Sequence, residues 1–488
     1  MLRTSFLSDL SKSNPCTQES GLRHVATDTN GAVSACADAA LGAERRTTRL
    51  VELASVLGQP PTAALPEACG DGGMLTAASR FLEHDAIDAP DMWHSPVEST
   101  SRRLAHASGV LAVPETTEVN WTRPPATQGV GPRGHTACHG RLVHTPCALT
   151  PARVPLGLLA QQGWAREPND VGKRARRQHL PISQQASQPW LPSLDAVSTA
   201  RGGGPTTRLV SVGDRDAEVS AVVAAARPAG VALRLRAAWD RCVSGPERAL
   251  WATVEAQPVV ERLRWHVPRR GPQAARAATL ARRVCPGTLG PPRHRQREGV
   301  PAVTLWAVQV QEVDPPTDVT PIAWLLLTTV AVDPMAEAIE RVEWYACRWG
   351  MAVGHRLWQS GCRIAERQWA SGERVPRCLT RSRVIAWRIF SATRLARAVP
   401  DMPGSVWLEL DAWQAWSGAI PQCPTPPAEP PSRDQGGHWI AQRGGFVGRR
   451  RRDQPGAETW WRGFQPFMDL PKMSRIMRPE PSIRPKPS

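Results

Sequence analysis

The sequence predicts a mixed α/β protein whose core carries a β-rich insertion and is flanked by a small helical module at each end. Three observations predict this class. Apolar residues recur at helical spacing through residues 41–109. Two strand-like apolar runs lead to acidic residues, Glu115 and Asp214. A long amphipathic helix is predicted over residues 334–365, and the 488-residue chain is long enough for about two to four domains with separate cores.

The N-terminal part is predicted to be a disordered tail, residues 1–40, followed by a helical module, residues 41–109. In LGAERRTTRLVELASVLGQ three leucines fall near one helix face, and arginines crowd the first turns. The leucines are Leu50, Leu53 and Leu57, and the arginines are Arg45, Arg46 and Arg49. MLTAASRFLEHDAI indicates a second helix and VESTSRRLAHASG a short third one. The arginine-rich face predicts a DNA-binding domain, with Arg45 and Arg46 as contacts.

Residues 110–400 are predicted to form the core. GVLAVPETTEVNW indicates a strand that ends at Glu115, and RLVHTPCALTP and VPLGLLAQQGWAR indicate two strands of a meander. TRLVSVGDRDAEVSAVVAAARPAG indicates a buried strand, a turn that carries Asp214, and a helix. Short apolar stretches alternate with Arg/Pro loops over about residues 230–320, which predicts the β-rich insertion.

The end of the core combines a strand with two helices. The apolar run AWLLLTTVAV predicts the strand, and the amphipathic pattern over residues 334–365 predicts the long helix. The segment RSRVIAWRIFSATRLARAV predicts the second helix. The Pro-rich segment CPTPPAEPPSRDQ is a predicted linker. The remainder of residues 401–488 is predicted to contain a short module and a tail.

The formal charge of +16 favours a polyanionic partner, because neutralising phosphates drives non-specific nucleic-acid binding. Only 4 of the 60 basic residues are lysine, and the chain has 1 tyrosine, as expected when codons rich in A and T are avoided. Charge is therefore weak evidence for DNA by itself. No apolar run reaches the roughly 18 residues of a membrane span, and the first residues are too polar for a signal peptide, so we expect no membrane partner and a cytoplasmic location.

The 11 cysteines are scattered without a C-x-x-C motif, which indicates neither a zinc framework nor a disulfide scaffold. One group of metal-binding residue types lies in GPRGHTACHGRLVH: His135, Cys138, His139 and His144. Glycine and proline in this segment argue against a helix that would aim an i, i+4 pair at one ion. We therefore do not expect a structural zinc site here.

The order of core elements indicates a different metal chemistry. Two strands that lead to acids, followed by an insertion and a helix with a third acid, could hold two divalent ions. One ion would activate a water or a 3′-hydroxyl, and the other would stabilise the leaving oxygen of a phosphodiester. Carboxylates suit magnesium because it prefers hard oxygen ligands. The simpler alternative is that Glu115 and Asp214 merely follow strands, as many acids do.

Six segments in matching order make the chain resemble bacterial cut-and-paste DDE transposases of the insertion sequence four family, particularly the transposon-five type. The resemblance runs over about residues 41–470. The segments are LGAERRTTRLVELASVL with AASRFL, PETTEVNW, RLVHTPCALTPARVPLGLLAQQGWAR, VGDRDAEV, WLLLT, and WIAQRGGFVGRRRRDQPGAETWWRGF. The resemblance implies an RNase H-like catalytic core, Mg²⁺ or Mn²⁺ as cofactor, double-stranded transposon ends as partner, and a homodimer formed through a C-terminal dimerisation module within residues 401–488.

The resemblance also assigns roles to residues. Glu115 stands where the family has its first Asp, and Asp214 matches the second, which implies that both are catalytic metal ligands. The family helix reads Y-x2-R-x3-E-x6-K. Tyr345 and Arg348 match it and are implied to grip the phosphate beside a flipped base. Trp324 of WLLLT is implied to support that base; alternatively, it is only a core aromatic.

Two positions of this helix depart from the family pattern. Ala352 replaces the third acid, and alanine cannot ligate a metal. Gln359 replaces the lysine, which removes a phosphate-binding cation at a predicted DNA-binding position. In addition, Glu115 is one methylene longer than Asp, which displaces a ligand of a preorganised site by about an ångström.

The sequence therefore leaves two main hypotheses open. One is a transposase for DNA cleavage and strand transfer that is catalytically impaired by Ala352. The other is a non-catalytic DNA-binding relic or a competitor of an active transposase. A third alternative is that substitutions such as Ser79 and Arg443 leave the protein poorly folded.

Overall fold

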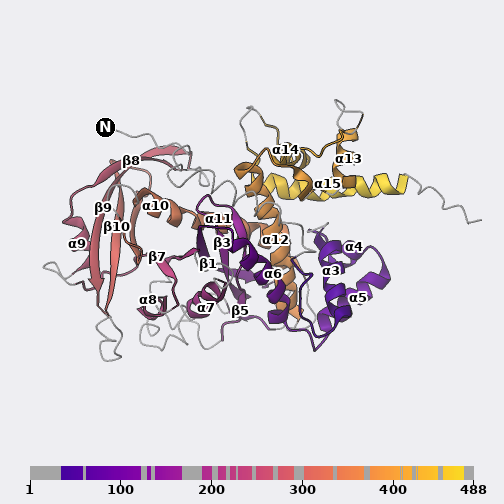
Figure 1. The fold of residues 1–488 in the computed structure, drawn as a ribbon, viewed down its shortest axis with the longest axis horizontal. Helices are drawn as coiled ribbons and strands as arrows, with labels where there is room; N and C mark the ends of the chain where they lie inside the picture. The colour runs from indigo at the N-terminus through magenta and orange to yellow at the C-terminus, as the bar shows by residue number, and fades with distance from the viewer. Residues whose placement is uncertain are drawn as a thin grey trace, which may run out of the picture.

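The structure is a computed structural model, and its description covers most of the chain between residues 35 and 477. The described residues are 35–58, 62–122, 129–132, 138–167, 189–200, 207–215, 220–226, 229–243, 249–267, 273–290, 302–332, 338–367, 374–406, 408, 410–419, 425, 427–448 and 454–477. Most of the predicted tail, residues 1–34, and His135 lie outside them. The result is a mixed α/β fold with one large mixed sheet and helical regions at both ends (Figure 1).

The described part of the N-terminal region contains the helices α3 (Glu44–Gly58), α4 (Leu65–Cys69), α5 (Gly72–Glu83) and α6 (Ala89–Leu104). The leucines that predicted α3 are buried, as its apolar face requires. Asp71 caps α5 by accepting a hydrogen bond from the Met74 amide at 2.8 Å. The third helix is longer than the predicted residues 97–109. It starts at Ala89, where Asp88 precedes a proline in the first turn, a common helix start.

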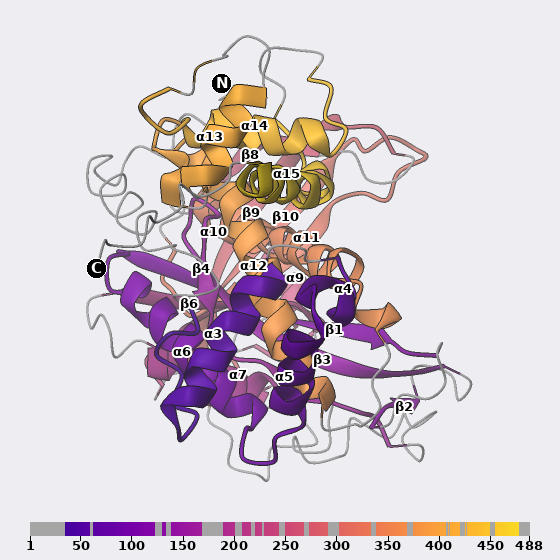
Figure 2. The same cartoon turned by 90° about the vertical axis from the view of Figure 1, so that its right-hand side faces the viewer.

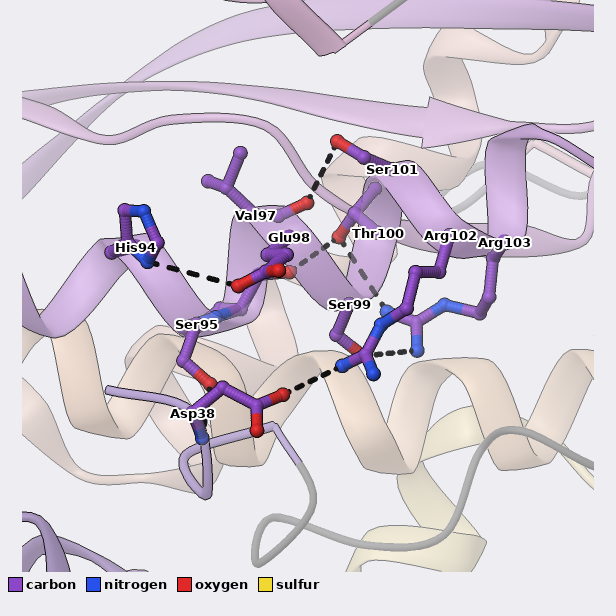
Figure 3. Close-up of polar contacts among 11 residues, drawn as sticks. Asp38, His94, Ser95, Val97, Glu98, Ser99, Thr100, Ser101, Arg102 and Arg103 are labelled. Carbon is purple, nitrogen blue, oxygen red and sulfur yellow. Dashed lines mark hydrogen bonds and ion pairs between the residues drawn. The ribbon is translucent and has the colours of Figure 1, made fainter. Parts of the chain in front are cut away.

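Figure 3 shows the polar contacts within the last turns of helix α6 and between α6 and Asp38. Further contacts of the same turns join α6 to the sheet. Arg103 is buried, donates to the Leu156 carbonyl, and reaches the Ser99 hydroxyl at 2.7 Å. Thr100 donates to the Leu158 carbonyl at 3.0 Å. On the exposed side, Arg102 pairs with Asp38 at 2.9 Å. The buried contacts fix α6 against strand β4 (Pro155–Leu158).

The sheet has 11 strands, and the order of its main path is β2-β3-β1-β6-β7-β11-β10-β9-β8. The strands on this path are β1 (Gly109–Asn120), β2 (Gly131–Pro132), β3 (His139–Leu149), β6 (Arg208–Gly213), β7 (Ala232–Arg236), β8 (Glu261–Val267), β9 (Arg276–Leu289), β10 (Val303–Val313) and β11 (Ala323–Thr328). Strand β1 is antiparallel to β3 but parallel to β6, which is parallel to β7. Strands β8–β10 extend the sheet as antiparallel neighbours within the predicted β-rich insertion, and β11 joins them to β7.

Two strand predictions need correction. Strand β1 does not end at Glu115, because its backbone stays paired with β3 as far as Asn120 opposite Gly140. The second meander strand is two short strands, β4 and β5 (Gln162–Trp164), which both pair with β3. Residues 159–161 between them are not strand, so one continuous strand is not formed.

Side chains of β1 alternate between the two faces of the sheet, and each face has its own core. Val110 and Ala112 pack with α7 (Trp190–Ala200) and α8 (Ser220–Ala226). Leu111 and Val113 pack instead with residues of α10–α12. A further apolar cluster lies where α9 (Leu250–Glu255) covers part of β9–β11. This burial on both faces explains the apolar character of the central strands.

The predicted long helix over residues 334–365 is interrupted. It consists of α10 (Ala338–Ala346), α11 (Arg348–Arg356), a π-helical turn (Leu357–Gly361) and a 3₁₀ turn (Ile364–Glu366). At Cys347 the amide bonds to the carbonyls of both Glu343 and Trp344, which marks a local tightening between α10 and α11. Arg363 takes the left-handed conformation with φ of 49°, which ends the regular part.

Helix α12 (Arg374–Ala398) runs through the middle of the molecule and is mostly buried. It contacts α3 and α5 of the N-terminal region as well as α11. Helices α13 (Leu410–Ala419), α14 (Arg433–Arg443) and α15 (Ala457–Met477) form a C-terminal layer beside it (Figures 1 and 2). In the described part of the chain, no helix is long and apolar enough to cross a membrane.

Candidate catalytic and DNA-binding site

The structure brings the two predicted acids together from neighbouring strands. Glu115 lies within β1, and Asp214 directly follows β6. In the parallel ladder of these strands Ala112 pairs with Ser211. Continuing this register by three residues brings Glu115 level with Asp214, at the end of the sheet where β6 ends. The two carboxylates therefore share one edge of the core.

Arg348, at the start of α11, bridges the two acids. Its Nη2 atom lies 2.5 Å from Glu115 Oε2 and 3.1 Å from Asp214 Oδ2. The site is partly shielded, since the exposed fraction of the side chain is 14% for Arg348, 22% for Glu115 and 29% for Asp214. Burial by itself lowers the pKa of Arg348, but Glu115 and Asp214 outweigh burial and raise this pKa. The guanidinium is therefore a permanent cation between two carboxylates.

Ala352 lies one turn beyond Arg348 in α11 and is exposed. The helix therefore presents a methyl group at the position of the predicted third acid. Glu366, further along, belongs to the 3₁₀ turn and pairs with Arg363. Within the described ranges, no group of three or more His, Cys, Asp or Glu side chains is arranged to hold a metal ion. The residues present therefore do not fit a three-carboxylate, two-metal site.

Trp324 and Tyr345, the other predicted DNA-binding residues of the core, lie in an aromatic cluster beside Arg348. The ring of Trp324 in β11 contacts Tyr345 edge-on, with 5.6 Å between centroids, and both are buried. The Arg348 guanidinium lies 5.9 Å from the centre of the Tyr345 ring, within reach of a cation–π contact. Trp324 is thus both a core aromatic and a neighbour of the candidate site.

Two tryptophans complete this cluster and were not predicted from the sequence. The ring centroids of Trp265 of β8 and Trp324 lie 6.3 Å apart, and those of Trp349 and Trp324 lie 5.6 Å apart. Trp349 keeps 42% of its surface exposed. The sequence feature that could have indicated Trp349 is its position directly after Arg348, on the polar side of an amphipathic helix. For Trp265 the signal was the alternation of β8, which puts it on the same face as buried Leu263.

Gln359 is directed to the backbone of β1. Its amide nitrogen, in the π-helical turn, donates to Thr117 Oγ1 at 2.7 Å and to the Glu118 carbonyl at 3.0 Å. These bonds tie the end of the α11 segment to the strand that carries Glu115. The predicted DNA-binding role of Gln359 stays a prediction, and contact with DNA would require that these bonds be replaced.

The arginines predicted for DNA binding in the N-terminal module lie apart from the acids. Arg45 is exposed on α3, whereas Arg46 is half-buried and donates to the Leu41 carbonyl at 2.9 Å. Helix α12 contacts both α3 and α11 and lies between them in Figures 1 and 2. Any DNA contact at Arg45 would therefore be a second surface, separate from Arg348.

Two buried histidines lie behind the site. The Nδ1 atom of His144 lies 2.8 Å from the Thr116 hydroxyl, next to Glu115. Burial lowers the pKa of His144 to about 4. His355 of α11 also has a pKa well below the ordinary value, because of burial and then because of Arg383, His144 and Arg348. Both rings are therefore neutral at pH 7. Neither role was predicted from the sequence.

Comparison with protein families identifies both ends of the chain. Residues 30–87 match the family model described as transposase DNA-binding, and residues 384–479 match that described as the transposase Tn5 dimerisation domain. The chain is a Tn5-type transposase-family protein with DNA-binding and dimerisation domains. The first match includes α3–α5, and the second runs from within α12 through α15. The boundaries predicted at residues 41–109 and 401–488 overlap these matches and stay predictions.

The candidate site of this transposase-family protein lies between the two matched ranges. Glu115, Asp214 and Arg348 all fall within residues 88–383. The family matches therefore identify the terminal domains, while the assignment of the central residues depends on the geometry described above.

Proposed function

We propose that this transposase-family protein binds double-stranded transposon ends as a homodimer and is impaired in metal-dependent cleavage and strand transfer. The observation that carries the second part is the site itself: Arg348 pairs with both acids, and Ala352 stands at the third-acid position. The DNA-binding and dimerisation domains support the first part. Because its partner is bacterial DNA, the proposed place of action is the cytoplasm, at the nucleoid.

We also propose an RNase H-like topology for the core, residues 110–400. This proposal is supported by the combination of parallel and antiparallel strand pairs beside the two acids. Strand β1 has an antiparallel partner, β3, on one side and a parallel partner, β6, on the other, and the acids lie on β1 and after β6. The insertion of β8–β10 lies between the second acid and α11 in the chain.

The metal chemistry of the family explains the proposed impairment. Paired Mg²⁺ or Mn²⁺ ions, when bound, activate the attacking oxygen and stabilise the leaving oxygen. Glu115 and Asp214 are the residues of this chain that would hold such ions. They lack a third carboxylate partner at residue 352, and Arg348 already occupies the space between them. The residues present therefore do not support the two-ion arrangement.

The test is a gel-shift and cleavage assay on the inverted repeats that flank the gene, with a shuffled duplex of equal length as control. We expect specific binding that weakens steeply between low and physiological salt, because phosphate contacts release counterions. We expect no nicking with magnesium and little with manganese. Absence of binding at both salt concentrations would refute the DNA-binding role. Efficient nicking by the unaltered chain would refute the impairment.

A second function, as a competitor of an active transposase, follows from the same observations. Trp324, Tyr345 and Arg348 remain grouped beside the acids, and both terminal domains are retained. Such a chain could occupy ends, or pair with active subunits, without cutting. Adding it to an active relative in a transposition assay should lower the yield. An unchanged yield at a tenfold excess would exclude competition.

A further inference from the structure

We propose that Arg348 is an internal counter-ion that takes the place of a divalent cation between Glu115 and Asp214 and closes the two-carboxylate site to metal. This inference depends on the proposed function only in taking these acids as the metal-ligand positions. It assigns the arginine a role within the protein itself, independent of DNA. Three features of the described residues carry it: the geometry of the bridge, the anchoring of α11, and the missing charge at residue 352.

The bridge has the geometry of a shared cation. One atom, Nη2 of Arg348, approaches an oxygen of each acid at 2.5 and 3.1 Å. Glu115 and Asp214 would hold a divalent ion through their carboxylates, and the guanidinium already engages both of these carboxylates. The arginine and a metal ion would therefore compete for the same two side chains. The guanidinium has the advantage of being part of the chain, and arginine stays charged in proteins.

Arg348 is held at this position by the packing of its helix. Gly350 and Gly354 face the Phe390 ring of α12, and a β-carbon at either glycine would lie 3.6 Å from that ring. The helix thus approaches α12 closely on one side while Arg348 points to the acids. The Tyr345 ring flanks the guanidinium at 5.9 Å. With only 14% of its side chain exposed, Arg348 has little freedom to leave the acids.

Ala352 determines the charge balance that makes this bridge stable. Residue 352 lies at the i+4 position from Arg348, where an acid would be close enough to attract the guanidinium along the helix. With an acid there, three carboxylates would face one arginine and leave two negative charges for metal. With alanine, two carboxylates face one arginine and leave a single negative charge. Divalent cations therefore lose both a ligand and half of the net negative charge that would attract them.

The experiment measures metal binding by the full-length protein in the absence of DNA, with Tb³⁺ luminescence excited through tryptophan and with Mn²⁺ electron paramagnetic resonance. Arg348→Gln removes the cation at nearly constant size, and Arg348→Lys keeps the charge. Arg102→Gln is the matched control, since Arg102 lies on α6 and forms an exposed ion pair with Asp38. We expect at least tenfold tighter saturable binding for Arg348→Gln only, and loss of this gain in Arg348→Gln/Asp214→Asn.

Equal metal affinity of the unaltered protein and folded Arg348→Gln would overturn the proposal. So would a gain of the same size in Arg102→Gln. If Arg348→Gln fails to fold, the unaltered protein alone decides: its melting temperature should be the same in EDTA and in 10-fold molar excess of Mn²⁺, and a saturable rise that Asp214→Asn abolishes would overturn the inference. Because no DNA is present, failure here is distinguishable from failure of the proposed DNA binding.

Discussion

At the scale of single residues, the chemistry depends on what residue 352 contributes. If Ala352 is the main lesion, Ala352→Glu should restore metal-dependent nicking of a labelled transposon end. The new carboxylate would supply the third ligand and, at i+4, would share the Arg348 guanidinium with Glu115 and Asp214. Recovery should be partial, because Glu115 is still longer than aspartate and Gln359 still bonds to β1.

Adding Glu115→Asp and Gln359→Lys should raise the nicking rate further and non-additively, because ligands of one metal pair act as a unit. The assay compares magnesium with manganese for each variant. The matched control is Ala352→Gln, which has similar size but no charge and should stay inactive. A folded, DNA-binding triple variant without nicking would place the defect outside these three positions.

The buried histidines predict how stability responds to pH. Burial holds the folded-state pKa of His144 at about 4 and that of His355 well below the ordinary value. As the pH falls, these histidines are therefore protonated in the unfolded chain at a higher pH than in the folded protein. Each neutral histidine makes its full contribution to the free energy of unfolding above about pH 6.5. This contribution is lost as the pH falls toward 4, at up to about 1.4 kcal/mol per pH unit for each histidine.

Urea unfolding at pH 7, 6 and 5 measures this loss. His144→Asn, which keeps a hydrogen-bonding group near Thr116, should lower the dependence on pH over this range. His94→Asn is the matched surface control, since His94 is exposed on α6 and pairs with Glu98. If His144→Asn keeps the full slope, the neutral buried state assigned to His144 is wrong.

At the scale of elements, the contact between α14 and α15 depends on the absence of side chains. A β-carbon at Gly463 of α15 would lie 1.7 Å from the Ile440 carbonyl oxygen, and one at Gly444, directly after α14, would lie 1.8 Å from the Thr459 carbonyl. The two backbones therefore touch. Gly463→Ala should destabilise the C-terminal layer by about 3 kcal/mol or more, although alanine favours helices by about 1 kcal/mol.

Thermal unfolding and size-exclusion chromatography test this contact, because the layer lies within the match to the dimerisation domain. Gly456→Ala, at the start of the same helix, is the control, since a β-carbon there meets nothing within 4 Å. Loss of the dimer in Gly463→Ala only is the expected result. Equal stability of both variants would show that the close approach is not required.

Elements with strong local patterns were predictable from the sequence, whereas their ends and contacts were not. The leucine spacing of α3 and the apolar run of β11 are local signals, and both elements occur where they were predicted. The extension of β1 past Glu115 is decided by pairing with β3, and the break at Cys347 by packing of α11 on α12. Neither partner is visible from the segment itself.

The same limit applies to the candidate site. Glu115, Asp214 and Arg348 could be named from spacing and resemblance, and the structure brings them together. The pairing of Arg348 with both acids was not predictable, because it depends on how β1, the end of β6 and the start of α11 are placed against one another in the folded protein. Gln359 illustrates the opposite case: a residue assigned to DNA turns to the strand beside it, because Thr117 offers a hydroxyl within 2.7 Å.

At the scale of the whole molecule, α12 holds the N-terminal region to the core through arginines. Arg377 of α12 is buried and donates to the Leu82 carbonyl at 2.6 Å, and Arg374 pairs with Glu83. Leu82 and Glu83 are the last residues of α5, where backbone carbonyls lack helical partners and the helix dipole favours cations. The DNA-binding domain is thus fixed on the core by charge and hydrogen bonds at one helix end.

This arrangement predicts that Arg377→Met loosens the N-terminal region selectively. Loss of the donor leaves the buried Leu82 carbonyl unpaired, at a cost of about 1–3 kcal/mol. Hydrogen exchange of amides in α5 should accelerate, while amides of β1 and β6, which are paired within the sheet, keep their protection. Arg102→Met, which breaks only an exposed pair, should change neither. Equal acceleration in α5 and the sheet would mean instead that α12 stabilises the molecule as one cooperative unit, with no separable DNA-binding domain.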